Sequence, residues 1–154
     1  ETYDFDYLID EKGIATLKIF GTPYCKIFGN WAFMVSDEKL EKKYSECPMD
    51  VDIFISHDSP TTNGLGMINE GYSKGVDAGS HVLATYIASR KPKFFFSGHI
   101  HTGNHKYEKV GETGMANVSY INERYTPVYP ILVLDIEGEE VKESYLDCET
   151  EGYY

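Results

Sequence analysis

Three histidines follow two apolar stretches of the chain, at the points where those stretches end. Residues 51–56 lead into His57, and residues 94–97 lead through a glycine into His99 and His101. Neutral imidazoles are good ligands for first-row metals such as Mn, Fe, Zn or Ni. A lone His-x-His is more often a pair of loop histidines without a ligand, but histidines converging from two strand tips favour a metal site.

The segment between the two apolar stretches decides whether these tips meet. Residues 77–90 predict a helix with an apolar face, and His81 within it is interpreted as a helix histidine, not a ligand. A strand–helix–strand unit is a crossover between parallel strands, whose carboxyl ends lie at one edge of the sheet. We therefore expect His57 beside His99 and His101. The Gly-, Asn- and Ser-rich residues 61–76 predict a mobile loop over that edge.

The remaining patterns predict a single α/β domain. Ser36 is typical of a helix N-cap, and Leu40 and Tyr44 would share one face of the helix that follows. After His101 the pattern changes to antiparallel strands, ending in a tail after Cys148 that we expect to fray. The expected strands are residues 7–10, 14–20, 51–56, 94–97, 114–119, 131–136 and 141–145.

Composition excludes some classes of function. The chain has 154 residues, with 25 acidic and 14 basic side chains, for a formal net charge of −11. Such a surface repels a phosphate backbone, so we expect no nucleic-acid binding. No apolar run is long enough to span a bilayer. Three cysteines without Cys-x-x-Cys spacing, Cys25, Cys47 and Cys148, predict reduced thiols in a cytoplasmic protein.

A glycine-broken aromatic loop occupies residues 28–33. Asn30 stands next to Trp31, the only tryptophan, and these two side chains could line a pocket. The alternative is a surface loop that packs its aromatic side chains on the core. The pattern leaves both open.

The order of these segments resembles the calcineurin-like metallophosphoesterases, and within them the branch of small metallophosphoesterase-domain proteins. Residues 56–60, Ser-His-Asp-Ser-Pro, look like that branch's Thr-His-Gly-Pro-Pro, and residues 98–101, Gly-His-Ile-His, match the closing Gly-His-x-His motif. Residues 28–33, residues 117–119 and, downstream of them, residues 122–125 look like the same branch. The likeness runs in consistent order from Leu8 to Ile136.

The resemblance implies a fold, a site and an activity. The fold would be part of a four-layer α-β-β-α sandwich, and the reaction would be hydrolysis of a small phosphomonoester or phosphodiester by two divalent metal ions. His57 and His99 would bind one ion, and His101 the other. Asn30, Trp31 and Asn117 would contact the substrate.

The departures from the family pattern are equally informative. The motifs Asp-x-His, Gly-Asp and Gly-Asn-His-Glu/Asp do not occur, so the resemblance leaves no catalytic residue in this chain. The chain also opens on Glu1, not Met. We expect residues 1–154 to be one domain, the C-terminal portion of a metallophosphoesterase domain that lacks the first strand–helix units. The alternative is an inactive relative with a binding or structural role.

The predicted sheet has a consequence for association. A sheet without its first strands would leave an apolar edge and faces uncovered. We therefore expect this chain to pair with the missing N-terminal segment or to self-associate.

Overall fold

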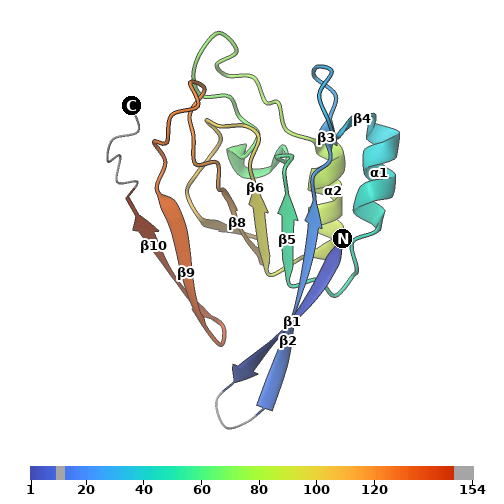
Figure 1. Cartoon of the computed structure of the whole chain (residues 1–154), viewed down its shortest axis with the longest axis vertical. Coiled ribbons are helices and arrows are strands. Elements are labelled where there is room, and N and C mark those ends of the chain that lie inside the picture. Colours follow the sequence, from blue (N-terminus) through green and yellow to red (C-terminus); the bar gives the residue numbers. More distant parts are fainter. Residues whose placement is uncertain (10–12, 148–154) are drawn as a thin grey trace.

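A six-stranded mixed sheet forms the centre of the computed structural model, which describes residues 1–9 and 13–147 (Figure 1). The strand order is β1-β2-β5-β6-β8-β7. The four inner strands run parallel, and the two edge strands pair antiparallel to their neighbours. The predicted mixed α/β fold is therefore confirmed. The strands span Thr2–Ile9 (β1), Gly13–Thr22 (β2), Ile53–Ser56 (β5), Phe94–Ser97 (β6), Glu108–Val110 (β7) and Thr113–Asn117 (β8).

Two helices cover one face of this sheet. Helix α1 spans Asp37–Ser45 and α2 spans His81–Arg90, and they pack side by side (Figure 1). Their buried side chains meet a row of apolar residues that lie opposite one another across the inner strands. The row consists of Phe20, Phe54, Phe95 and Met115. This row fixes the register of the strands that carry the histidines.

The opposite face of the sheet is less well covered. Ile55, at the centre of the sheet on β5, has 44% of its surface exposed. Strands β9 (Ile131–Glu137) and β10 (Glu140–Leu146) form a hairpin that pairs with no strand of the large sheet. A second small sheet joins β3 (Cys25–Lys26) and β4 (Met34–Val35). The described residues thus form one helical layer, one large sheet and a separate hairpin of the predicted four-layer sandwich.

The crossover between β5 and β6 differs from its prediction in two ways. The helix begins at His81 and not at Asp77, because Ser80 Oγ caps it by accepting from the Leu83 N–H at 3.2 Å. Residues 61–76 contain a short 3₁₀ helix, η2 (Thr62–Gly64), followed by hydrogen-bonded turns, and Leu65 is fully buried. The first half of this segment is therefore anchored to the core through Leu65, whereas residues 69–76 are exposed, and the predicted mobility stays a prediction.

Strand β8 corrects the prediction for the later part of the chain. It pairs parallel with β6, whereas the pattern predicts antiparallel strands after His101. Its short antiparallel partner β7 has no clear signal in the sequence. The β9–β10 hairpin is confirmed. Cys25 and Cys47 are free and buried, as expected, while Cys148 and the tail lie outside the described residues.

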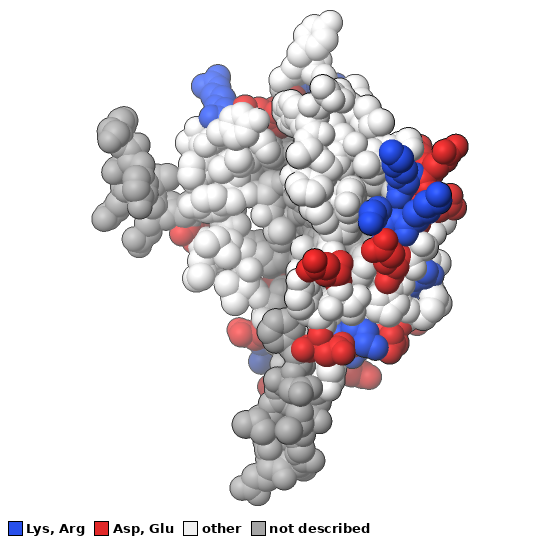
Figure 2. Space-filling view, turned by 45° about the vertical axis from the view of Figure 1, so that its right-hand side comes forward, with Lys and Arg blue, Asp and Glu red and all other residues white. Residues whose placement is uncertain are grey.

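Two further expectations concern nucleic-acid binding and membrane-spanning segments, and the surface and the helices bear on them. On the face shown in Figure 2, acidic and basic side chains of the described residues are intermixed, with no continuous basic patch. Neither α1 nor α2, the helices of the described residues, is long and apolar enough to cross a membrane.

Candidate functional site

The imidazoles of His57 and His99 lie side by side at the carboxyl ends of β5 and β6. Ser56 and Ser97, the last residues of these strands, are paired in register, so the chain leaves both strands at the same level. The two ring centroids are 4.7 Å apart, with an interplanar angle of 59°. The sheet and its crossover therefore bring these two predicted ligands together.

Both imidazoles are neutral near pH 7. Burial lowers the pKa of His99 to about 4, and the charges of His57, His101 and Lys26 act in the same direction. Burial also lowers the pKa of His57, with His101 as the second cause. A neutral imidazole keeps a lone pair for a metal ion, which a protonated one lacks.

The backbone at the tip of β6 is unusual. His99 has a φ of 63°, in the left-handed region that non-glycine residues rarely adopt. The Ile100 N–H donates to the Gly98 carbonyl at 2.7 Å, which closes a tight turn around His99. A strained backbone of this kind costs about 1–3 kcal/mol and is found most often at functional sites.

His101 sits differently from the other two histidines. Its Nδ1 is buried and has no hydrogen-bond partner in the described part of the chain, and Glu123 Oε1 lies 3.8 Å away. The ring also packs edge-on against Tyr125, with 5.5 Å between ring centroids. An unpaired buried nitrogen is a group that a metal ion could satisfy.

The three histidines form an incomplete site. No group of three His, Cys, Asp or Glu side chains among residues 1–9 and 13–147 is placed to hold one metal ion. His57 and His99 make a pair, and His101 acts on both electrostatically without completing a group of three. The donor chemistry fits a divalent metal, since it offers two neutral rings and one unpaired nitrogen. The number of ligands does not fill a coordination sphere, and metal binding stays a prediction.

Asn117 anchors the turn that carries the histidines. Only 2% of its surface is exposed, and its Nδ2 donates to the carbonyls of Ile100 at 2.7 Å and Leu65 at 3.2 Å. Its Oδ1 accepts from the Ser119 N–H at 2.8 Å. The sequence prediction places this amide in contact with substrate, but it is buried and already engaged. Its position supports a role in holding the loop.

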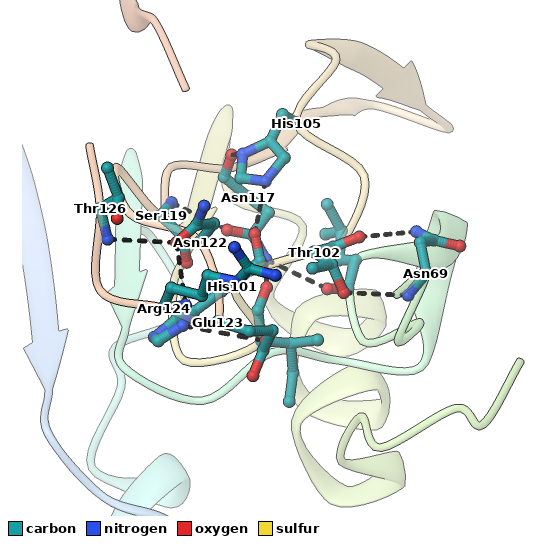
Figure 3. Close-up of polar contacts among 12 residues, drawn as sticks. Asn69, His101, Thr102, His105, Asn117, Ser119, Asn122, Glu123, Arg124 and Thr126 are labelled. Carbon is teal, nitrogen blue, oxygen red and sulfur yellow. Dashed lines mark hydrogen bonds and ion pairs between the residues drawn. The ribbon is translucent and has the colours of Figure 1, made fainter. Parts of the chain in front are cut away.

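Further polar side chains secure the same turn, and Figure 3 shows how they converge on it. His105 contacts the carbonyl oxygens of His101 at 2.8 Å and Asn117 at 3.1 Å, and it stacks on Tyr129 with ring centroids 3.7 Å apart. Asn69 donates to both the backbone carbonyl and the hydroxyl of Thr102. The sequence does not reveal these contacts because loop conformation sets them: Asn69 reaches Thr102 across 33 positions, and His105 reaches the Asn117 carbonyl across 12.

Asp58 plays the corresponding part beside His57. Its buried carboxylate accepts hydrogen bonds from the N–H of Lys26 at 3.2 Å, the N–H of Ser59 at 3.0 Å and the hydroxyl of Tyr44 at 3.3 Å. Burial raises the pKa of this carboxyl to about 6. These contacts tie the His57 turn to β3 and α1.

The aromatic loop at residues 28–33 lies next to His99. The Phe28 ring is 5.0 Å from the His99 ring and 5.3 Å from the Trp31 ring, centroid to centroid. Phe28, Trp31 and Phe33 are each more than half exposed, and Asn30 is exposed as well. The alternative of aromatic side chains packed on the core is therefore wrong for these three. Contact of Asn30 and Trp31 with substrate stays a prediction.

Comparison with known proteins gives relatives in a nematode. No protein-family model matches the chain. The UPF0046 protein T07D4.2 of Caenorhabditis elegans is 31% identical over 137 residues, covering 88% of this chain and 30% of that protein. The UPF0046 protein C25E10.12 of the same organism is 29% identical over 134 residues, covering 84% and 46%. The chain thus spans less than half the length of either relative.

One solved structure is similar over nearly the whole chain. It is GAP50, the anchor in the inner membrane complex of Plasmodium, with a TM-score of 0.59 and 12% identity. The match covers 97% of this chain and 50% of that one. Identity this low speaks to the fold alone. The chain therefore shares its fold with half of GAP50, and its sequence is similar to part of two UPF0046 proteins.

Proposed function

We propose that this chain is part of a metal-dependent phosphoesterase that hydrolyses a small phosphomonoester or phosphodiester, resembling the calcineurin-like family. The observation that carries the proposal is the pair of neutral imidazoles, His57 and His99, held 4.7 Å apart at the tips of adjacent parallel strands. Two such rings at one sheet edge are an economical way to bind a divalent ion.

In this proposal the histidines bind metal, and four other residues hold the site or contact the substrate. His57 and His99 bind one ion, and His101 contributes its unpaired Nδ1 to a second. Two divalent ions supply positive charge for the phosphate and activate water near neutral pH, chemistry that a strongly acidic protein does not provide by itself. Asn117 and Asp58 hold the two turns, while Asn30 and Trp31 contact the substrate from the exposed loop.

The proposal assigns only part of the active site to this chain. The three histidines supply too few ligands for two ions, and nothing in the chain is assigned as a general acid. The chain also covers 30% and 46% of its two nematode relatives. We infer that it is the C-terminal portion of a metallophosphoesterase domain and that the remaining ligands come from a segment outside residues 1–154.

Metal binding and turnover can be tested separately. We expect His57→Ala and His99→Ala each to lower the Mn²⁺ content found by elemental analysis after dialysis. His81→Ala is the matched control, because this histidine is exposed on α2, not at a strand tip, and its Nδ1 lies 3.3 Å from the Thr61 hydroxyl. Equal metal content in all four proteins would contradict the assignment. A nitrophenyl phosphodiester with Mn²⁺ then measures turnover, which we expect to be weak or absent with residues 1–154 alone.

A second candidate function is an inactive module with a binding or structural role. The observation that favours it is that the described residues offer no group of three metal ligands. The two candidates differ in a chain extended to the length of the nematode relatives. Metal-dependent hydrolysis by that longer chain supports the enzyme, and its absence supports the module.

A further inference from the structure

A tight turn at residues 122–126, here called the Glu123 turn, is held rigid by its own hydrogen bonds. Asn122 Oδ1 accepts from the N–H groups of Arg124 at 2.9 Å and Thr126 at 3.1 Å. The Asn122 N–H donates to the Thr126 carbonyl at 3.0 Å, and the Tyr125 N–H donates to the backbone carbonyl of Asn122 at 2.9 Å. These hydrogen bonds all lie within the turn itself, and Figure 3 shows those that Asn122 accepts from Arg124 and Thr126.

The Glu123 turn presents two side chains to His101. The Tyr125 ring packs edge-on against the imidazole, and Glu123 Oε1 faces Nδ1 from 3.8 Å. That separation is too long for a hydrogen bond. The nitrogen is nevertheless buried and has no other partner in the described residues. A carboxylate and an imidazole nitrogen thus face each other across a gap that neither fills.

The width of this gap suits a shared cation. Zinc binds nitrogen and oxygen ligands at about 2.0–2.2 Å, so two ligands of one tetrahedral ion lie about 3.4 Å apart. The observed 3.8 Å is within reach of a small side-chain rotation. A bare ion pair is the competing explanation, but Glu123 is 55% exposed and such surface pairs contribute little, about 0–1 kcal/mol.

The surroundings of the Glu123 turn favour positive charge. Burial raises the pKa of Tyr129, and the nearby carboxylates of Glu70 and Glu123 raise it further. The carboxylates of Glu70 and Glu123, from separate loops, therefore lie near Tyr129. Tyr129 stacks on His105, and His105 contacts the His101 carbonyl. A divalent cation beside His101 would be attracted by both carboxylates.

We propose that Glu123 is a metal ligand, paired with His101 on one divalent cation. The inference rests on the proposed function, because it extends the metal site assigned to the three histidines. Glu123 lies in a segment that looks like the calcineurin-like branch, residues 122–125, but the resemblance assigns it no role as a metal ligand. It brings the ligands that this chain supplies to four, as two pairs: His57 with His99, and His101 with Glu123.

The test is isothermal titration of the metal-free protein with Mn²⁺ and with Zn²⁺ alone. We expect Glu123→Gln, which keeps the shape but removes the charge, to weaken one binding event by at least about tenfold. Glu112→Gln is the matched control, because Glu112 is another exposed glutamate. It lies in the turn between β7 and β8 and forms an ion pair with Lys91. Its Kd should equal that of the wild-type protein.

Three other outcomes are distinguishable. Unchanged binding in Glu123→Gln together with loss in His57→Ala and His99→Ala overturns the inference and leaves the proposed function standing. No binding by the wild-type protein overturns the inference together with the assignment of His57 and His99 as ligands that hold metal in residues 1–154. Equal weakening in Glu123→Gln and Glu112→Gln would reflect loss of general negative charge and also overturns the inference. A melting temperature measured without metal shows whether the Glu123→Gln variant folds.

Discussion

Replacing Asn117 by alanine would remove the central support of the histidine turn. The substitution deletes three hydrogen bonds, to the carbonyls of Leu65 and Ile100 and from the N–H of Ser119. Each such bond contributes about 1 kcal/mol net, so we expect a loss of about 3 kcal/mol of unfolding free energy. Asn117 is buried, so the substitution leaves the two carbonyls and the Ser119 N–H without this partner inside the fold.

Urea denaturation followed by circular dichroism measures this loss. With a slope of about 2 kcal/mol per molar urea, a loss of 3 kcal/mol moves the midpoint down by about 1.5 M. Val118→Ala is the matched control: Val118 follows Asn117 in the chain and is 47% exposed, so its midpoint should move by less than about 0.3 M. If Asn117→Ala and Val118→Ala had equal midpoints, the amide would not hold the turn and our reasoning would be refuted.

Two further predictions follow from buried charge and from the uncovered sheet face. Folding raises the pKa of Asp58 from its ordinary value near 3.8 to about 6. Between these two pH values the folded protein binds more protons than the unfolded chain. The free energy of unfolding therefore falls as pH rises through this window, by about 3 kcal/mol in all. The urea midpoint of the metal-free wild-type protein should fall between pH 4 and pH 7 relative to the midpoint of the Asp58→Asn variant, which lacks this carboxyl. If the midpoints of the two proteins changed with pH in the same way, the prediction would be contradicted. Because Ile55 is 44% exposed at the centre of the sheet, we also expect residues 1–154 to self-associate, and light scattering that finds a stable monomer at high concentration would disprove this.

Much of the fold follows from local patterns in the sequence. The strands that carry His57 and His99 are short, β-branched or aromatic, and separated by a helix, so their parallel pairing follows from the crossover rule. Leu40 and Tyr44 are buried as the helical spacing predicts. These elements are defined by interactions that repeat every two or every 3.6 residues, and the sequence displays both periods.

The parts that sequence analysis missed depend on distant partners. Residues 61–76 are predicted as a mobile loop because glycine and asparagine are common in loops, yet Leu65 is core and its carbonyl binds Asn117, 52 positions away. The burial of Asn117 and its hydrogen bonds to Leu65 and Ile100 likewise cannot be read from its neighbours in the chain, while the substrate contact that the resemblance implies for it stays a prediction. Helix α2 starts four residues late because Ser80, not Asp77, supplies the cap.

The candidate site shows the same division. Two of its three histidines meet as predicted, because the topology alone brings their strands together. The surroundings of His101 come from the Glu123 turn and from His105, whose contacts are set by loop conformation. No spacing rule predicts these contacts, so only the structure identifies Glu123 and His105 as neighbours of His101.

The central claim is that His57 and His99 bind one metal ion together, and anomalous diffraction from crystals soaked in Mn²⁺ tests it most directly. We predict an anomalous peak between the two rings, with a nitrogen of each at about 2.0–2.3 Å from the ion. A peak elsewhere, or none at a Mn²⁺ concentration well above the measured Kd, would contradict the account. The distance between the ring centroids, 4.7 Å without metal, should change little if the pair is preformed.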